Sequence, residues 1–333
     1  MSKIHEALKK AEQERSTSVS GDIQHDPIGI DIPAAHREDL NASPNRVLST
    51  APESARKRIS EEFLRFDNLV KNCAKPVWHP NPYEMVFCGS TSAIDGAEQF
   101  RTLRSRLYHL RETSPIKKVL VTSALSGEGK TFVAVNLAHA IARQRDRRVL
   151  LIDGDFRCSR LHEPLGAPLS PGLSEYLRGE ATEVAVIQYG MKDDFCFISA
   201  GNPVSNPSEL LATDRMGKLL ERLAPVFDWI IVDTAPTLAV SDASLLGALC
   251  DGVLLVVRAS STSYELADRA RKEFKERTIL GVVLNRAANK EDYLSYYYEG
   301  RSGASFNASK MTPLLGRAVA VVRRSGPREN SSK

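Results

Sequence analysis

The 333-residue sequence is poor in cysteine and has no long apolar run. Its five cysteines are scattered, odd in number and without CxxC spacing, which argues against a disulfide framework or a cysteine-based metal site and indicates a reducing compartment. No stretch approaches the roughly 18 apolar residues that a membrane-spanning helix needs. The charged start, MSKIHEALKKAEQERS, also lacks the apolar region of a signal peptide. We therefore expect a soluble, cytoplasmic protein, for which any membrane role comes through a partner or a peripheral contact.

Charge of one sign is not in large excess either. The formal net charge is +4, and no concentrated basic stretch stands out. Nucleic-acid binding usually requires such a basic face, so we expect no nucleic-acid partner. Hydrophobic residues make up 42% of the chain, which is enough for a sizeable core in one or two domains.

The composition divides the chain into four parts. Residues 1–16 predict a short N-terminal helix, with Ile4 and Leu8 on one face. Residues 17–82 are largely polar and aperiodic, which predicts a disordered linker with a possible short helix at 61–70. The globular domain is expected over 83–290. Residues 291–333 form the expected flexible tail, in which the apolar stretch 313–322 is either an added strand, plain flexible chain or a weak amphipathic membrane-surface segment.

Apolar runs of strand length alternate with helical patterns from about residue 85 onward. Continuous apolar strands separated by helices predict a doubly wound, mostly parallel α/β sheet that is covered on both faces. The functional site of such a sheet lies at the carboxyl ends of its strands. The expected strands are 118–123, 148–153, 195–200, 229–233, 252–257 and 279–285.

A phosphate-binding loop follows the first of these strands. The segment ALSGEGKT (124–131) has the spacing of a Walker A motif, with Ala124 in place of the usual first glycine. Gly127 and Gly129 let successive backbone N–H groups point at phosphate oxygens, and the next helix presents its positive N-terminus to the same anion. Lys130 is expected to reach the β- and γ-phosphates and Thr131 to bind Mg²⁺. The alternative is a glycine-rich turn with an incidental lysine.

Carboxylates end two later strands. Asp153 and Asp155 stand at the tip of one strand and Asp233 at the tip of another. Three carboxylates would repel a triphosphate unless a cation intervenes, and Mg²⁺ suits one or two carboxylates together with phosphate oxygens. A remaining carboxylate is positioned to accept a proton from an attacking hydroxyl. The alternative, for each residue alone, is an aspartate that stabilises a turn.

These motifs resemble those of the bacterial tyrosine kinases of exopolysaccharide and capsule synthesis, over about residues 84–300. The resemblance implies a phosphate-loop fold of the Walker A, A′ and B type, with ATP and Mg²⁺ as cofactors. The matching motifs are SALSGEGKT (123–131), LLIDGDFR (150–157), GLSEYLRGE (172–180), NPSELL (206–211), IIVDTAP (230–236) and GVVLN (281–285).

The resemblance also assigns roles to single residues. It implies that Lys130, Asp153, Asp155 and Asp233 are catalytic, with Asp153 as the candidate base for the incoming phenol. Thr131, Asp155 and Asp233 would hold Mg²⁺ or its waters, although which Walker A′ aspartate has which role stays open. The implied nucleotide-binding set is Ser126, Gly127, Glu128, Gly129, Lys130, Thr131, Phe132 and Asn285, the last of which resembles the residue that reads adenine.

Two further features extend the resemblance. Glu98, Arg101 and Arg104 match the ExxRxxR helix by which family members contact a neighbouring subunit in a ring; the alternative is a solvated charged helix. The segment YLSYYYEG (293–300) holds four of the nine tyrosines between polar flanks, which argues for an exposed run. In the family such a run is the autophosphorylation target of an adjacent subunit. The expected targets are Tyr293, Tyr296, Tyr297 and Tyr298.

The implied function is an ATP-dependent protein tyrosine autokinase that regulates polysaccharide polymerisation and export. The implied partners are further copies of the chain in a ring, a separate membrane-spanning polysaccharide co-polymerase and a tyrosine phosphatase. The co-polymerase would recruit the cytoplasmic kinase to the inner face of the cell membrane and activate it. One alternative is a spatial-organisation ATPase of the partition or septum-site kind. Those proteins carry a lysine where this chain has Leu125, and they lack a tyrosine cluster. The other alternative is a nucleotide-dependent scaffold without catalysis.

Overall fold

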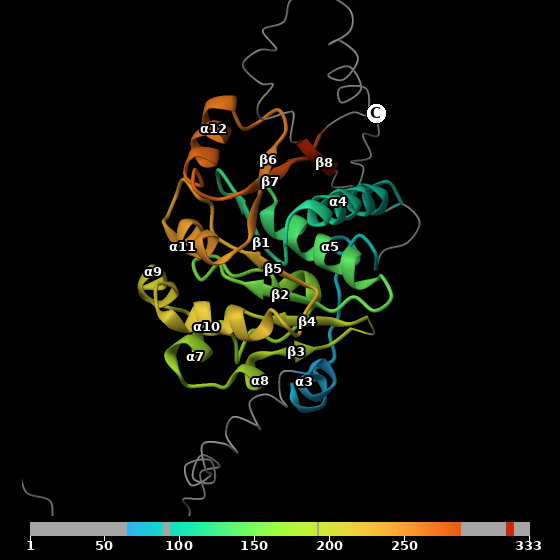
Figure 1. The fold of residues 1–333 in the computed structure, drawn as a ribbon, viewed down its shortest axis with the longest axis vertical. Coiled ribbons are helices and arrows are strands. Elements are labelled where there is room, and N and C mark those ends of the chain that lie inside the picture. Colours follow the sequence, from blue (N-terminus) through green and yellow to red (C-terminus); the bar gives the residue numbers. More distant parts are fainter. Residues whose placement is uncertain (1–64, 89–93, 192, 288–317, 323–333) are drawn as a thin grey trace, which may run out of the picture. The chain divides into compact units, whose positions relative to one another are not determined.

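An eight-stranded, mostly parallel β-sheet lies at the centre of the structure (Figure 1). This computed structural model describes residues 65–88, 94–191, 193–287 and 318–322. The expected N-terminal helix, the linker up to residue 64 and the tyrosine cluster lie outside the described residues, so these remain predictions.

The strand order is β3-β4-β2-β5-β1-β6-β7-β8, and the described pairs are parallel except β3–β4. All six strands predicted from the sequence are present, and β3 and β8 are additional. The strands are β1 (Lys118–Ser123), β2 (Val149–Asp153), β3 (Gln188–Tyr189), β4 (Phe195–Ile198), β5 (Trp229–Asp233), β6 (Gly252–Arg258), β7 (Ile279–Asn285) and β8 (Ala318–Val322).

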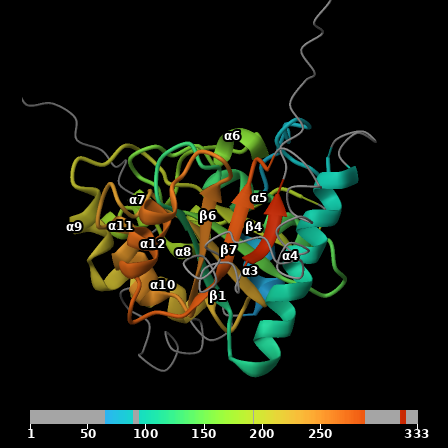
Figure 2. The same cartoon turned by 90° about the horizontal axis from the view of Figure 1, so that it is seen from above.

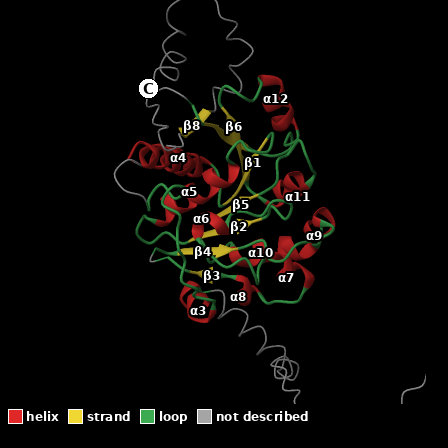
Figure 3. Cartoon of the chain, turned by 180° about the vertical axis from the view of Figure 1, so that it is seen from behind, coloured by secondary structure: helices red, strands yellow, loops and turns green. Residues whose placement is uncertain are grey.

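Helices cover both faces of this sheet (Figure 3). One face packs against α4 and α5, and the other packs against α7, α10 and α11. The described helices are α3 (Phe66–Asn72), α4 (Ile94–Thr113), α5 (Lys130–Ala142), α6 (His162–Leu165), α7 (Leu173–Arg178), α8 (Glu183–Val186), α9 (Pro207–Leu211), α10 (Asp214–Leu223), α11 (Asp242–Leu249) and α12 (Tyr264–Lys272).

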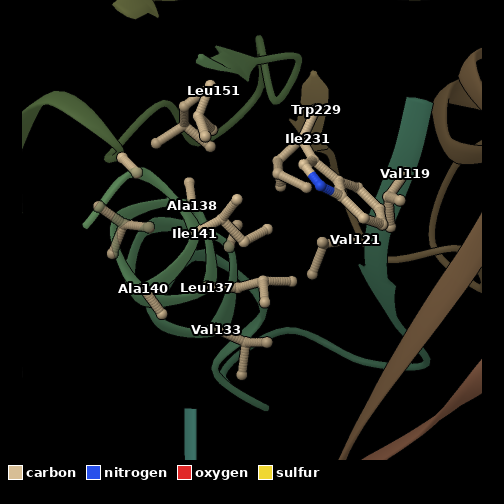
Figure 4. Packing of buried hydrophobic residues seen from close by; sticks show 14 of the residues in the cluster. Val119, Val121, Val133, Leu137, Ala138, Ala140, Ile141, Leu151, Trp229 and Ile231 are labelled. Atoms are coloured by element: carbon tan, nitrogen blue, oxygen red, sulfur yellow. The ribbon is translucent and has the colours of Figure 1, made fainter. Parts of the chain in front are cut away.

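Successive residues of each strand supply the two opposite cores. Val119 and Leu151 join the core under α5, whereas Leu120 and Leu150 join the core on the other face. This alternation follows from the two-residue period of a strand, and it explains why the central strands are apolar throughout. Figure 4 shows α5 inserting Val133, Leu137 and Ile141 and other side chains toward β1, β2 and β5; the labelled strand residues are Val119, Val121, Leu151, Trp229 and Ile231.

The domain begins before the boundary expected at residue 83. Helix α3 starts at Phe66, and both Phe66 and Leu69 are buried in the core on the α10 side of the sheet. Trp78 is 5% exposed and makes edge-to-face contacts with Phe195 and Phe197 of β4. Helix α3 overlaps the possible short helix expected at 61–70, whereas the prediction of a disordered linker is wrong for the rest of residues 65–82. The few aromatic residues in this polar stretch are enough to anchor it to the sheet.

The segment expected to be a tail also contributes to the sheet. Strand β8 pairs in parallel with β7, with Val322 opposite Asn285, and it packs beside α4. Of the alternatives for residues 313–322, the added strand is present at 318–322. The rest of the expected tail lies outside the described residues.

The order of the strands in the sheet identifies the edge at which a ligand is expected to bind. From β1 the chain crosses to β2, returns through β5 between them, and then continues on the opposite side of β1 with β6 and β7. The carboxyl end of β1 is therefore a topological switch point, where ligands of open α/β sheets bind. The phosphate loop follows β1 at this point.

Candidate nucleotide and phosphoryl-transfer site

The phosphate loop (residues 124–129) joins the end of β1 to the first residue of α5. Gly127 and Gly129 have φ angles of 79° and 96°, in the left-handed region that favours glycine. A Cβ atom on Gly129 would also collide with the side-chain amide of Asn285. The glycines predicted from the motif are therefore required by backbone conformation and, at Gly129, by a close approach.

Lys130 and Thr131 begin α5 and face the acidic strand ends. The Lys130 Nζ atom lies 2.8 Å from Oδ2 of Asp155, and the Thr131 hydroxyl donates to Oδ2 of Asp233 at 2.7 Å. Burial alone would lower the pKa of Lys130, but the charges of Asp233 and Asp155 outweigh it, so that the pKa is raised. Lys130 is therefore a permanent cation at the N-terminus of α5.

The three predicted aspartates converge on this lysine. Asp153 and Asp233 are directly opposite each other in the β2–β5 pairing, and Asp155 follows two residues after β2. All three are at most 2% exposed. Oδ1 of Asp155 accepts the backbone N–H groups of Arg157 and Cys158 at 3.2 and 3.0 Å. The parallel sheet thus brings together residues that are 80 positions apart in sequence.

Asp153 is fully buried and is held by the loop that follows β2. Its Oδ2 atom accepts the Ser159 hydroxyl at 2.8 Å and the Leu161 N–H at 3.3 Å. Burial raises the pKa of Asp153 to about 7, and the charge of Asp233 adds to this shift. Burial likewise raises the pKa of Asp233 to about 6, against the opposing charge of Lys130. Ser159 and Leu161 are site residues that the sequence motif did not indicate.

The donor set suits a hydrated Mg²⁺ ion. Oδ1 of Asp233 is buried and has no hydrogen-bond partner among the described residues, although its other oxygen accepts from Thr131. A buried carboxylate oxygen without a donor is matched by a cation. Within the described part of the chain, no group of three or more His, Cys, Asp or Glu side chains is arranged to hold a metal by itself. Phosphate oxygens and waters would have to complete the coordination of an ion at Asp233, Thr131 and Asp155.

Arg157 of the Walker A′ motif binds another part of the protein. Its guanidinium donates to both carboxylate oxygens of Asp242 at 2.8 and 3.2 Å, and to the Ser208 hydroxyl at 3.0 Å. Ser208 lies in α9 and belongs to the NPSELL motif, and Asp242 begins α11 and is fully buried. This ion pair fixes the loop after β2 against two helices. It also gives the NPSELL motif a structural role.

Glu128 and Asn285 have different surroundings from those their expected roles suggest. The buried Glu128 carboxylate accepts the Leu125 N–H at 2.7 Å, the Arg258 N–H at 3.3 Å and the hydroxyl of Thr262. Asn285, at the end of β7, donates its side-chain amide to the Glu128 carbonyl at 2.7 Å. In this conformation both residues brace the phosphate loop against the ends of β6 and β7.

Two other members of the expected nucleotide-binding set, Ser126 and Phe132, differ in their surroundings. Ser126 is exposed in the loop, where its side chain is free to meet a ligand. The Phe132 ring instead packs edge-to-face on Phe100 of α4, with 5.8 Å between ring centroids. The half-buried side chain of Phe132 therefore packs against the core under α4.

The ExxRxxR helix is α4, and its three motif residues divide into two environments. Glu98 and Arg101 form an exposed ion pair at 2.9 Å. Arg104 is half-buried and donates to the Ala140 carbonyl of α5 at 2.6 Å. The motif therefore presents one charged pair to solvent and uses its third residue to join α4 to α5. No described helix is long and apolar enough to cross a membrane.

Comparison with known proteins identifies the domain. Residues 119–301 match the model of the CobQ/CobB/MinD/ParA nucleotide-binding domain, and this range contains the phosphate loop and all three aspartates. The chain is 32% identical over 204 residues to tyrosine-protein kinase YwqD of Bacillus subtilis, covering 60% of this chain and 86% of YwqD. It is 37% identical over 237 residues to tyrosine-protein kinase Etk of Escherichia coli K12, covering 69% of this chain.

The structure agrees with these sequence matches. It is similar to the kinase domain of the Escherichia coli tyrosine kinase ETK, with a TM-score of 0.58 and 35% identity, covering 63% of this chain and 84% of that domain. The chain spans only about a third of the whole Etk protein (32% of its length). With the fold, the phosphate loop and the acidic strand ends in agreement, the chain belongs to the bacterial tyrosine kinase family of phosphate-loop enzymes.

Proposed function

We propose that this chain is an ATP-dependent protein tyrosine kinase that phosphorylates the tyrosine cluster of a neighbouring copy. The observation that carries this proposal is the convergence of Lys130, Thr131 and the three aspartates at the carboxyl ends of β1, β2 and β5. A phosphate loop alone specifies nucleotide binding and no particular reaction. The buried Asp153 beside it supplies the additional group that an acceptor hydroxyl needs.

The residues of the chain have separable roles in this reaction. The loop N–H groups and Lys130 bind the triphosphate, and Lys130 offsets negative charge on the γ-phosphate. A bound Mg²⁺ would neutralise further triphosphate charge. The tyrosine oxygen attacks the γ-phosphorus in line, the bond to the β–γ bridging oxygen breaks, and ADP leaves. Asp153 orients the phenol and accepts its proton. The products are phosphotyrosine and ADP.

We also propose that the kinase acts in a ring-like oligomer, under a separate membrane partner, on exopolysaccharide or capsule polymerisation and export. The support is the family resemblance, together with the exposed Glu98–Arg101 pair on α4. Leu125 stands where partition-type ATPases carry a second lysine, which favours the kinase over that alternative.

Phosphate incorporation tests the proposal. Purified chain is incubated with labelled ATP and Mg²⁺ beside three variants: Lys130→Met, the quadruple Tyr→Phe change at 293, 296, 297 and 298, and the matched control Tyr83→Phe. Tyr83 is 79% exposed but lies outside the cluster. We expect labelled phosphotyrosine in the wild type and in Tyr83→Phe, and loss of at least about tenfold in the other two. If the chain binds ATP tightly but incorporates no label, even when the cytosolic segment of a membrane partner is added, the result would support the non-catalytic scaffold.

A further inference from the structure

The loop after β2 (residues 154–161) contains two arginines in contrasting environments. Arg157 is bound by Asp242 and Ser208. The Arg160 side chain is exposed and makes no hydrogen bond, ion pair or ring contact with any residue in the described part of the chain. Arg157 therefore stabilises the fold, whereas Arg160 leaves a full positive charge open to a ligand.

The backbone places Arg160 beside the candidate base. The residues on either side of it, Ser159 and Leu161, both donate to Oδ2 of Asp153, at 2.8 and 3.3 Å. Helix α6 begins two residues later, and Figure 2 shows it at the edge of the sheet toward which the arrowhead of β6 points. An acceptor tyrosine that reaches Asp153 must therefore pass close to the backbone of Arg160.

The acceptor segment carries the complementary charge. Glu291 and Asp292 precede Tyr293, and Glu299 follows Tyr298. Such a segment approaches a site that already contains three aspartates and would contain a triphosphate, so it meets electrostatic repulsion. Lys130 does not offset this repulsion for the acceptor, because it is paired with Asp155 and reserved for phosphate.

We propose that Arg160 is a specificity-determining residue that binds an anionic group beside the acceptor tyrosine. In this chain the anion is a carboxylate of Glu291, Asp292 or Glu299. A guanidinium forms paired, charge-assisted hydrogen bonds with carboxylate and with phosphate, so a phosphotyrosine next to an unmodified tyrosine offers the same chemistry. The inference rests on the proposed kinase function and adds the substrate class: tyrosines flanked by negative charge.

Five synthetic peptides test this proposal. The first is residues 288–301, the second replaces its three acids by Gln, Asn and Gln, and the third is that neutral peptide with phosphotyrosine at 298. The fourth has lysine in place of Glu291 and Asp292, and the fifth, used only for binding, is the acidic peptide with phenylalanine in place of every tyrosine. The enzymes are the wild-type chain, Arg160→Ala, Arg160→Glu and the matched control Arg145→Ala. Arg145 is another exposed arginine, placed beyond the far end of α5 from Lys130. KM and kcat for tyrosine phosphorylation are measured for each combination.

We expect the wild type to have a KM for the acidic peptide about tenfold below that for the neutral one, as one well-placed ion pair would give. Arg160→Ala raises the KM for the acidic peptide to the neutral value, and it leaves kcat and the KM for ATP unchanged. Arg145→Ala has no effect. Arg160→Glu recovers a low KM with a peptide in which Glu291 and Asp292 are lysines. A low KM for the phosphotyrosine peptide that is lost in Arg160→Ala shows that phosphate is bound as well.

Three results overturn the proposal. Equal KM values of the wild type for the acidic and neutral peptides refute it while leaving the kinase function intact. A kcat loss in Arg160→Ala with both peptides shows that Arg160 only supports the loop around Asp153. If the wild type labels no peptide, the kinase function itself is in question, and binding of an all-phenylalanine acidic peptide is measured by fluorescence anisotropy. Binding that does not depend on Arg160 then rejects the inference.

Discussion

The buried His139 is a titratable residue that the proposed reaction does not use. It lies on α5, is 3% exposed, and contacts the rings of Phe87 and Phe195. Its Nδ1 atom has no hydrogen-bond partner among the described residues, and its Nε2 atom is 3.7 Å from a carboxylate oxygen of Asp193. Burial lowers the pKa of His139 from 6.5 to about 4, despite the opposing charge of Asp193.

His139 is therefore expected to make the fold acid-sensitive. Between pH 6.5 and about 4 the unfolded chain binds a proton at this position that the folded chain does not, so stability falls as the pH falls through this window. At pH 7.5 both states are neutral and the contribution vanishes. We expect the unfolding free energy to drop from pH 7.5 to pH 5 by about 1–2 kcal/mol more in the wild type than in His139→Gln. Urea denaturation at the two pH values measures this, and equal drops in both proteins would contradict it.

The residues of the phosphoryl-transfer site divide into those that local sequence reveals and those it does not. Lys130, Thr131 and Asp233 were predictable because the Walker motifs place these residue types at fixed distances along the sequence from the end of an apolar strand. The partners of Glu128 and Arg157 were not, since Thr262 and Asp242 lie far along the chain and join the site only through strand order. The NPSELL motif marked the segment that contains Ser208, but nothing in the sequence indicated which residues the Ser208 hydroxyl would bind.

Besides the ring contact between Phe100 and Phe132, α4 and α5 are joined by a hydrogen bond that the ExxRxxR motif did not reveal. The Ala140 carbonyl lies in the last turn of α5, where carbonyl groups lack intrahelical donors. Arg104 donates to it at 2.6 Å, a favourable position for a cation at a helix C-terminus. Arg104 is half-buried, and this burial lowers the pKa of its guanidinium. Its neighbour Arg101 instead forms an exposed pair with Glu98.

The substitutions Arg104→Met and Arg101→Met should therefore affect different properties of the protein, stability in the first case and assembly in the second. We expect Arg104→Met to lower the unfolding free energy by about 1–2 kcal/mol, because a desolvated charge-assisted hydrogen bond is lost. Arg101→Met should change it by less than about 0.5 kcal/mol, as for exposed ion pairs, and should reduce the oligomer mass. Denaturant titration and light scattering measure the two effects. Unchanged stability of Arg104→Met, or an unchanged mass of Arg101→Met, would each reject the corresponding role.

Strands of the sheet centre were easier to predict than its edges. The central strands are continuous apolar runs because both faces are covered, and such runs are visible in sequence. Strand β3 has only two residues and gives no periodic signal, and the apolar stretch that contains β8 left the added strand as one of three alternatives. The helix α3 and Trp78 are held by contacts with distant residues of β4, α10 and their neighbours. Outside the possible helix expected at 61–70, the disorder prediction failed there because a few aromatic anchors outweighed a polar composition.

At the scale of the whole molecule, phosphorylation would reverse the charge of the chain. The formal net charge is +4, and each phosphotyrosine adds roughly −1.5 to −2. Four modified tyrosines would bring the net charge to between about −2 and −4. The added charge is concentrated within six positions that already have acidic neighbours, so copies held together in a ring would repel one another there.

We therefore expect full phosphorylation to loosen the proposed ring. Protein labelled to completion and protein treated with a tyrosine phosphatase are compared by light scattering at 50 mM and 500 mM salt. The phosphorylated sample should have the lower mass at low salt, and the difference should shrink at high salt, because screening weakens repulsion between exposed charges. The quadruple Tyr→Phe chain is the control and should keep the larger mass at both concentrations. If both wild-type samples have the same mass at low salt, phosphorylation does not act through charge repulsion between subunits.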